Sequence, residues 1–302
     1  ARARPACDGS SPLAGDAEAL SARLPDLLSL AGQTVVVKYG GNAMTDPDLS
    51  CSFYSDVLLL SRLGVDVVVV HGGGPQITAM LKALDIKSEF VDGRRVTDER
   101  AMEVVQMVLG GLVNTNLVAE LAKLGAKAVG LTGQTCRLLG ATRMRHFVAD
   151  ESGAKKAVDL GLVGEPTHVD SSVLHDLLAV GIIPVVAPIG MGVEDGKPYN
   201  INADTAAGAV AAALGASKLL LLTDVAGVLD KSGNLLRKIR LAEASDLESD
   251  GTITGGMIPK VQTAADAVRG GVREAVILDG RVDHALLLAL MPGADVGTAL
   301  LE

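Results

Sequence analysis

The chain has 302 residues, a formal net charge of −9, no Trp and only 2% aromatic residues. So few aromatic rings exclude a nucleic-acid platform built on base stacking, and the acidic balance argues against binding to nucleic acid or to an anionic membrane. Three widely spaced cysteines without a CxxC pair indicate neither a disulfide framework nor a structural zinc site.

Strand and helix patterns alternate along the first half of the chain, after an N-terminal extension. Residues 1–12 are basic and Ser-rich, which fits either the remnant of an organellar transit segment or a plain disordered terminus. Leucines at helical spacing over residues 16–30 predict an amphipathic helix that Pro25 kinks or breaks. The elements predicted next are strands at 34–38, 65–70 and 128–131 and helices at 48–63, 75–84, 98–109 and 112–124.

The alternation continues in the second half. Residues 143–148 and 165–169 are expected to pair as a hairpin, followed by helices at 171–180 and 204–214 and strands at 182–187, 218–222 and 275–278. This order predicts an α/β fold with an open, mostly parallel central sheet sandwiched by helices. The polar loop 190–197 is expected to divide the chain, beyond an extension at 1–32, into lobes at 33–190 and 191–302.

Glycine-rich motifs follow the predicted strands. They are KYGG at 38–41, HGGGP at 71–75 and, with fewer glycines, TDVAG at 223–227. Ligands bind at the carboxyl ends of strands in open parallel sheets, and glycines let backbone N–H groups approach anionic oxygens. Lys38, and Lys260 near a predicted helix start, add compact positive charge. The motifs predict a phosphate site without a P-loop, because no GxxxxGK[ST] is present.

Each motif alone also has a simpler interpretation. HGGGP fits a tight strand–helix turn or a hydrolase oxyanion loop, although the GxSxG elbow of such a hydrolase is missing. The polar residues of YNINAD (199–204) are good helix caps. Beside two lysines, Asp204 is also suited to holding both ammonium groups in register or to ligating magnesium. A Rossmann dehydrogenase is disfavoured because no GxGxxG follows a strand, and no His pair has metal-ligand spacing.

Taken together and in this order, the motifs resemble the amino-acid kinase family from about Thr34 to the end of the chain. Within that family they look most like the members that phosphorylate N-acetyl-L-glutamate, above all the plant and algal plastid versions. The segments that carry the resemblance are VVVKYGGNAM, VVHGGGPQI, FVDGRRVTD, VGLTG, YNINADTAAG, LLLTDVAGVLD and GGMIPKV. The resemblance implies ATP-dependent phosphorylation of the substrate's side-chain carboxylate in arginine biosynthesis, with ATP and Mg²⁺ as cofactors and no metal ligand from protein side chains.

The resemblance also implies the roles of individual residues. Lys38 and Lys260 would stabilise the transferring phosphoryl group, and Asp204 would organise both lysines. The 33–190 lobe would bind the acyl-amino-acid substrate and dimerise, and the 191–302 lobe would bind ATP. The implied substrate-binding residues are Gly73, Gly74, Arg95 and Asn200. The implied nucleotide-binding residues are Lys38, Gly40, Gly41, Thr223, Asp224 and Lys260. Arg94 is set aside because the matching position in the family is usually apolar.

Regulation and location follow from the same resemblance. We expect inhibition by L-arginine at a site that includes His284 and Gly297, a hexamer built as a trimer of dimers, binding to the PII signalling protein, and a chloroplast stroma location, with the bacterial cytoplasm as the alternative. Two departures from the family pattern weaken the expectation of arginine inhibition, because Asp26 stands where relatives have an aromatic residue and Ala289 where they have a carboxylate.

Two rival functions stay open. One is a kinase of the same fold that acts on a different carboxylate substrate. The other is a non-catalytic sensor of arginine or nucleotide, although a pure sensor has no use for Lys38, Asp204 and Lys260 together.

Overall fold

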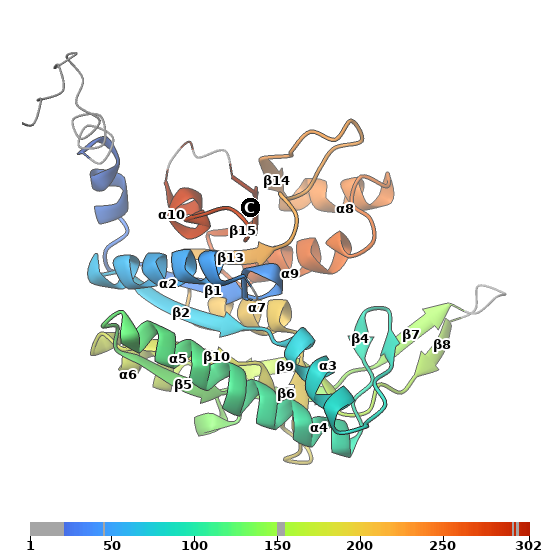
Figure 1. Ribbon diagram of the computed structural model, residues 1–302. Coiled ribbons are helices and arrows are strands. Elements are labelled where there is room, and N and C mark those ends of the chain that lie inside the picture. The colour runs from blue at the N-terminus through green and yellow to red at the C-terminus, as the bar shows by residue number, and fades with distance from the viewer. Residues whose placement is uncertain (1–20, 45, 150–154, 292, 294–295) are drawn as a thin grey trace, which may run out of the picture.

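The computed structural model describes residues 21–44, 46–149, 155–291, 293 and 296–302. The central sheet of the described residues has eight strands in the order β14-β16-β15-β13-β1-β2-β10-β5 (Figure 1). All neighbouring strands are parallel except β15 and β16, so the predicted mostly parallel sheet is confirmed. The strands are β1 (Thr34–Tyr39), β2 (Asp66–His71), β5 (Ala128–Thr132), β10 (Ile183–Ala187), β13 (Lys218–Thr223), β14 (Lys238–Arg240), β15 (Glu274–Asp279) and β16 (Thr298–Leu301).

Helices cover both faces of this sheet and form two hydrophobic cores. Successive side chains of a strand point to opposite faces, so Val35 and Val37 join one core and Val36 joins the other. The helices that pack in the first core include α2 (Pro47–Arg62), α3 (Gly74–Ala83), α5 (Asn114–Lys123) and α10 (Ala285–Leu290). Those of the second core include α6 (Ser172–Ala179), α7 (Ala203–Ala213), α8 (Leu241–Ser249) and α9 (Met257–Arg269).

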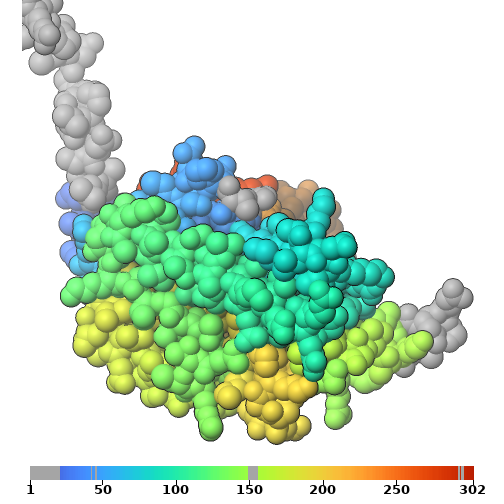
Figure 2. All heavy atoms as spheres, turned by 60° about the horizontal axis from the view of Figure 1, so that its bottom comes forward, coloured from blue at the N-terminus to red at the C-terminus, as the bar shows by residue number. Residues whose placement is uncertain are grey.

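One long helical run replaces the two helices predicted at 98–109 and 112–124. It comprises α4 (Glu99–Val105), the π-helix η2 (Gln106–Val113) and α5. The Gly110–Gly111 pair does not end the helix, since Val108, Leu109 and Val113 are buried around it. The run is long and apolar enough to span a membrane by length and composition, but its inner face packs in the first core. Figure 2 shows the run, teal to green, along one face of the molecule.

A smaller closed sheet lies beside the main one and corrects the predicted hairpin. It consists of β6 (Leu139–Arg143), β9 (Val163–Val169), β11 (Ile189–Gly192) and β12 (Pro198–Ile201). The sequence predicts that residues 143–148 pair with 165–169. Of residues 143–148, only Arg143, the last residue of β6, pairs with β9, because β7 (His146–Ala149) pairs instead with the nearer β8 (Lys155–Val158). A shorter loop costs less entropy to close. The expected lobe boundary, 190–197, lies within the β11–β12 hairpin.

The remaining elements are short. A hairpin of β3 (Phe90–Val91) and β4 (Arg94–Arg95) follows α3, and single 3-10 turns are formed by η1 (Gly41–Met44) and η3 (Thr135–Arg137). Near the N-terminus, residues 21–28 are helical without interruption at Pro25, so the predicted break is not observed there. The rest of the predicted 16–30 helix and the 1–12 segment lie outside the described residues.

Candidate active site

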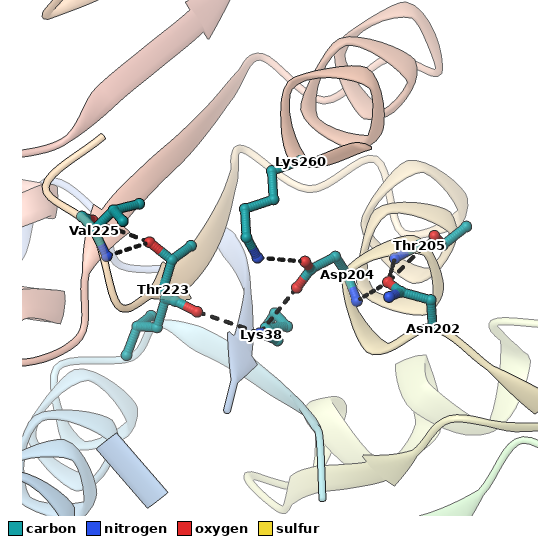
Figure 3. A network of polar contacts seen from close by, with 8 residues as sticks. Lys38, Asn202, Asp204, Thr205, Thr223, Val225 and Lys260 are labelled. Atoms are coloured by element: carbon teal, nitrogen blue, oxygen red, sulfur yellow. Dashed lines mark hydrogen bonds and ion pairs between the residues drawn. The ribbon is translucent and has the colours of Figure 1, made fainter. Parts of the chain in front are cut away.

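The two predicted lysines meet at one aspartate. Lys38 has the same alternation as Val36, so it points to the sheet face that α7 and α9 cover. The first turn of α7 carries Asp204, and the first turn of α9 carries Lys260. Lys38 Nζ lies 3.0 Å from Asp204 Oδ1, and Lys260 Nζ lies 2.8 Å from Asp204 Oδ2 (Figure 3). The structure therefore brings together three residues that are widely separated in the sequence.

Electrostatics keep Asp204 ionised. Burial alone would raise the pKa of Asp204, but the ammonium groups of Lys38 and Lys260 outweigh that effect and hold its pKa below the ordinary value. Lys260 donates a hydrogen bond to Oδ2, whereas the contact of Lys38 with Oδ1 is an ion pair without hydrogen-bond geometry. Lys38 donates instead to the carbonyl of Leu222, at 3.3 Å. Asp204 thus fixes both cations at the end of β1.

A pocket of about 360 Å³ opens beside the triad. The strands β13, β1 and β2 are parallel neighbours, so the glycine-rich turns after β1 and β2 reach the same edge of the sheet. The predicted site residues that line the pocket are Lys38, Gly40, Gly41, Gly73, Gly74, Arg95, Asn200, Asp204 and Lys260. Among the YNINAD residues, Asn202 caps α7 through its side-chain oxygen, which accepts from the N–H groups of Asp204 and Thr205.

Arg95 is held rigidly at one wall of this pocket. Its guanidinium donates to Ser88 Oγ, to Thr78 Oγ1 at 2.7 Å and to the carbonyl of Gly74 at 3.2 Å. The centroid of the Phe90 ring lies 4.6 Å from Arg95 Cζ. Burial lowers the pKa of Arg95, and no carboxylate among the described residues forms an ion pair with it. A buried guanidinium without a protein counter-ion is suited to binding an anionic ligand.

Thr223 and Asp224 lie at the end of β13 and not in the lining of this pocket. The Thr223 hydroxyl donates to the carbonyl of Val225 and accepts from its N–H group. These bonds fit the simpler interpretation, in which Thr223 belongs to a turn after the strand. Asp224 is close to the backbone of Gly41, because a Cβ atom built there would lie 2.7 Å from Asp224 Oδ1. The φ of Gly41 is +69°, so both conformation and space require glycine at this position.

The residues expected to bind arginine lie outside the pocket. His284 precedes α10, where its Nδ1 atom is 2.6 Å from the buried Asp56 Oδ1 and its backbone N–H donates to Ser52 Oγ. Gly297 precedes β16 with a φ of +76°, and a Cβ atom there would lie 2.5 Å from the carbonyl of Ile277. The contacts of His284 and the backbone conformation of Gly297 therefore explain why these residues occupy their positions without any ligand.

Several pocket residues carried no signal in the sequence. Leu109 reaches the pocket from η2, and Met144 and Val163 reach it from the neighbourhood of the closed sheet. Apolar residues in helices and strands look like core positions in a sequence, so only the tertiary structure assigns them to the site.

Comparison with known proteins identifies the family of the chain. The model of the "Amino acid kinase family" matches residues 33–279, which is most of the chain. The chain belongs to the amino-acid kinase family. Among curated proteins, this amino-acid kinase is 52% identical to "Acetylglutamate kinase" from Acidiphilium cryptum, with 97% of this chain and 98% of that protein covered. It is 53% identical to the protein of the same name from Novosphingobium aromaticivorans, with 94% and 95% covered.

Solved structures show the same fold. N-acetylglutamate synthase from Neisseria gonorrhoeae, in complex with coenzyme A and N-acetyl-glutamate, matches with a TM-score of 0.79 and 26% identity. The match covers 97% of this amino-acid kinase and 64% of the synthase. Carbamate kinase from Giardia lamblia bound to AMP-PNP matches with a TM-score of 0.60 and 19% identity, over 90% of this chain and 99% of that one.

Proposed function

We propose that this amino-acid kinase transfers the γ-phosphoryl group of ATP to the side-chain carboxylate of N-acetyl-L-glutamate, giving N-acetyl-L-glutamyl 5-phosphate and ADP. The reaction belongs to arginine biosynthesis. The observation that carries the proposal is the Lys38–Asp204–Lys260 triad beside a glycine-lined pocket, in which Arg95 forms no ion pair with any described carboxylate. The curated relatives named acetylglutamate kinase, at 52–53% identity over nearly the whole chain, support the choice of substrate.

The site matches the chemical demand of this reaction. A glutamate side chain has a reference pKa of about 4.3, so the nucleophile is already ionised at neutral pH and needs no general base. The obstacle is repulsion between carboxylate and phosphate, since two unit charges 4 Å apart interact by about 4 kcal/mol at an effective dielectric constant of 20. Lys38 and Lys260 would reduce that repulsion and stabilise the charge that develops during transfer.

Substrate and nucleotide would approach from different parts of the chain. Gly73, Gly74, Arg95 and Asn200 would hold N-acetyl-L-glutamate, with the guanidinium of Arg95 on a carboxylate. Gly40, Gly41, Thr223 and Asp224 would lie along the nucleotide. The proposed division into a substrate lobe at 33–190 and an ATP lobe at 191–302 holds for Gly73, Gly74, Arg95, Thr223 and Asp224. Asn200 and the glycines of the turn after β1 would each contribute across that boundary, at one pocket on one shared sheet.

Magnesium would enter with the nucleotide. No group of three or more His, Cys, Asp or Glu residues that could hold a metal ion exists among the residues that the structure describes. Lysines and glycine N–H groups suit the phosphates themselves. We expect Mg²⁺ to bind chiefly to ATP, where it would neutralise charge on the β- and γ-phosphates.

Regulation, assembly and location stay predictions from the resemblance. L-arginine inhibition would involve His284, Gly297 and the N-terminal helix, and the hexamer would form through that helix. PII binding is expected only if the protein resides in a plastid. The bacterial origin of the curated relatives favours the bacterial cytoplasm over the chloroplast stroma. Titration of activity with L-arginine, before and after removal of residues 1–32, tests the regulatory part.

A hydroxylamine assay tests the catalytic proposal. Purified protein with ATP, Mg²⁺ and N-acetyl-L-glutamate should give a hydroxamate, because hydroxylamine traps acyl phosphates. Glutamate and aspartate are run beside it at equal concentration. Preference for either of them would replace the proposed substrate with another acid, and ligand binding without ADP release in all reactions would favour the sensor.

A further inference from the structure

A buried histidine–asparagine pair lies behind the glycine turn of the pocket. His71 is the last residue of β2 and has the same alternation as Val67 and Val69, so it points into the first core. Asn114, the first residue of α5 directly after the π-helix η2, meets it there. Asn114 Nδ2 lies 3.0 Å from His71 Nε2. Both side chains are almost completely buried, at 0% and 3% exposure.

The surroundings of Asn114 fix the tautomer of His71. The same Nδ2 atom lies 2.9 Å from the carbonyl of Val185 and 3.4 Å from that of Leu131. Carbonyl oxygens only accept hydrogen bonds, so the NH₂ group of Asn114, and not its oxygen, must face them. Nε2 of His71 must therefore accept, so Nδ1 carries the proton in the neutral ring. Burial lowers the pKa of His71 to about 4, which keeps the ring neutral at physiological pH.

The Nδ1–H group of His71 then controls one peptide unit of the turn. It donates to the carbonyl of Gly72 at 2.8 Å. No peptide bond in the described chain is cis, and in a trans peptide the C=O and N–H groups point in opposite directions. Because the Gly72 carbonyl points to His71, the N–H of Gly73 points away from it. Gly73 lines the pocket, whereas His71 does not.

We propose that His71 and Asn114 are positioning residues that hold the Gly72–Gly73 peptide with its N–H group facing the pocket. A donor fixed before the substrate arrives costs no reorganisation when negative charge develops on the transferring group. The histidine of HGGGP thus acts through the backbone rather than as an acid, a base or a ligand. The inference rests on the proposed function only in assigning the Gly73 N–H group to a reacting oxygen.

Two variants of His71 separate this role from packing. In His71→Asn, the side-chain amide nitrogen replaces Nδ1 and retains the donor to Gly72. In His71→Gln, the side-chain oxygen replaces Nε2 and retains the contact with Asn114, but the donor to Gly72 is lost. Since loss of one oxyanion donor costs roughly 100- to 1000-fold in kcat, we expect kcat of His71→Gln to fall by about 10- to 100-fold. His71→Asn should stay within about threefold of the parent kcat.

Stability should follow the opposite order. Asparagine is smaller than histidine and removes one of the acceptors of Asn114, so His71→Asn should have the lower Tm. If His71 only fills space, kcat should track Tm and His71→Asn should be the poorer enzyme, a result that would overturn the proposal. A kcat for His71→Gln equal to that of the parent would overturn it as well.

A spectroscopic measurement on the unaltered protein tests the same idea without activity. ¹⁵N-labelled histidine gives separate signals for protonated and unprotonated ring nitrogens, and the His71 signals are assigned by their loss in His71→Asn. At pH 7.5 we expect a neutral ring with the proton on Nδ1. A proton on Nε2, or on both nitrogens, would refute the positioning role even if the protein proves to have a different substrate.

Discussion

At the scale of single residues, the site depends on one carboxylate shared by two cations. Asp204 is buried and lies within 3.0 Å of both ammonium groups. A buried charge is costly unless it is paired, and here each member of the triad supplies the counter-charge of another. Removal of the central member should therefore affect stability and catalysis together, whereas removal of a lysine leaves Asp204 with one partner.

Asp204→Asn tests the central position, because it retains the shape and removes the charge. Since Lys38 and Lys260 would then repel each other, we expect kcat to fall by about 100-fold or more and the protein to be less stable at pH 7. The pKa of Asp204 in the folded protein lies below its ordinary value of 3.8. The stabilisation from the ionised form is therefore complete above that value and is lost as pH falls through the folded pKa.

Urea unfolding of both proteins between pH 3 and 7 checks this expectation. The difference in unfolding free energy between the parent and Asp204→Asn should be constant near neutral pH and should shrink below about pH 3.8. A difference that grows on acidification would contradict the assignment of Asp204 as the ionised partner.

Arg95 is the second residue with a separable role. Its fork is oriented by Ser88, Thr78 and Gly74, so Arg95→Ala should chiefly raise KM for N-acetyl-L-glutamate, by roughly 10- to 100-fold for a lost charge-assisted pair. KM for ATP should change little. Arg94→Ala is the matched comparison, since Arg94 also borders the pocket but is not held in the same way. An equal rise in KM for both variants would mean that net charge, not the oriented fork of Arg95, is what matters.

At the scale of elements, the strands determine where the chemistry lies. The alternation along β1 sends Lys38 toward α7 and α9, and the same alternation along β2 sends His71 toward α5. The end of β1 thus supplies the charge of Lys38 to the site. The end of β2 supplies His71, which holds the turn after β2 from the opposite face of the sheet.

Alanine substitutions in that turn should differ sharply between neighbouring glycines. A Cβ atom on Gly73 would lie 2.5 Å from Leu109 Cδ2, whereas a Cβ atom on Gly74 would meet nothing within 4 Å. Because Leu109 lines the pocket, Gly73→Ala should displace it and lower kcat/KM by about 10-fold or more, the effect expected of a misplacement near 1 Å. Gly74→Ala should lose less.

The double variant Gly73→Ala with Leu109→Ala provides the control, measured by steady-state kinetics. It removes the steric conflict, so it should recover part of the lost activity. If the double variant is no better than Gly73→Ala alone, a steric cause for the loss is refuted.

The sequence predicts the helices and strands of this fold better than it predicts which strands pair and which helices join. Valine runs and glycine turns are local signals, so six strands of the main sheet and the strand-end motifs are predicted to within a few residues, whereas the short β14 and β16 are not predicted. Pairing is not local. The β6–β9 partnership, the β3–β4 hairpin that positions Arg95, and the joining of two helices through η2 depend on contacts that no short segment contains. Asn114 went unnoticed for the same reason, because its meaning depends on His71.

At the scale of the whole molecule, both halves of the chain share one sheet. The strand β1 lies between β2 from its own half and β13 from the other. The triad likewise combines Lys38 from the first half with Asp204 and Lys260 from the second. The proposed lobes are therefore divisions of function more than separable folding units.

Fragments 1–190 and 191–302 test this interdependence. Separation at residue 190 breaks the β11–β12 hairpin and leaves the hydrophobic edges of β1 and β13 unpaired, a state that favours aggregation. We expect neither fragment alone to show a cooperative thermal transition by circular dichroism, and the intact chain to unfold in a single calorimetric transition. A fragment with a sharp transition and dispersed NMR amide signals would contradict this prediction.

The central place of β1 has a consequence for synthesis on the ribosome. One neighbour, β2, follows it closely, but the other begins only at Lys218. At about 5–20 residues per second, translation takes roughly 10–40 s to reach β13 after β1 has been made. During that time the nascent chain carries a valine-rich strand with one open edge, and it is then most exposed to aggregation and in most need of a chaperone.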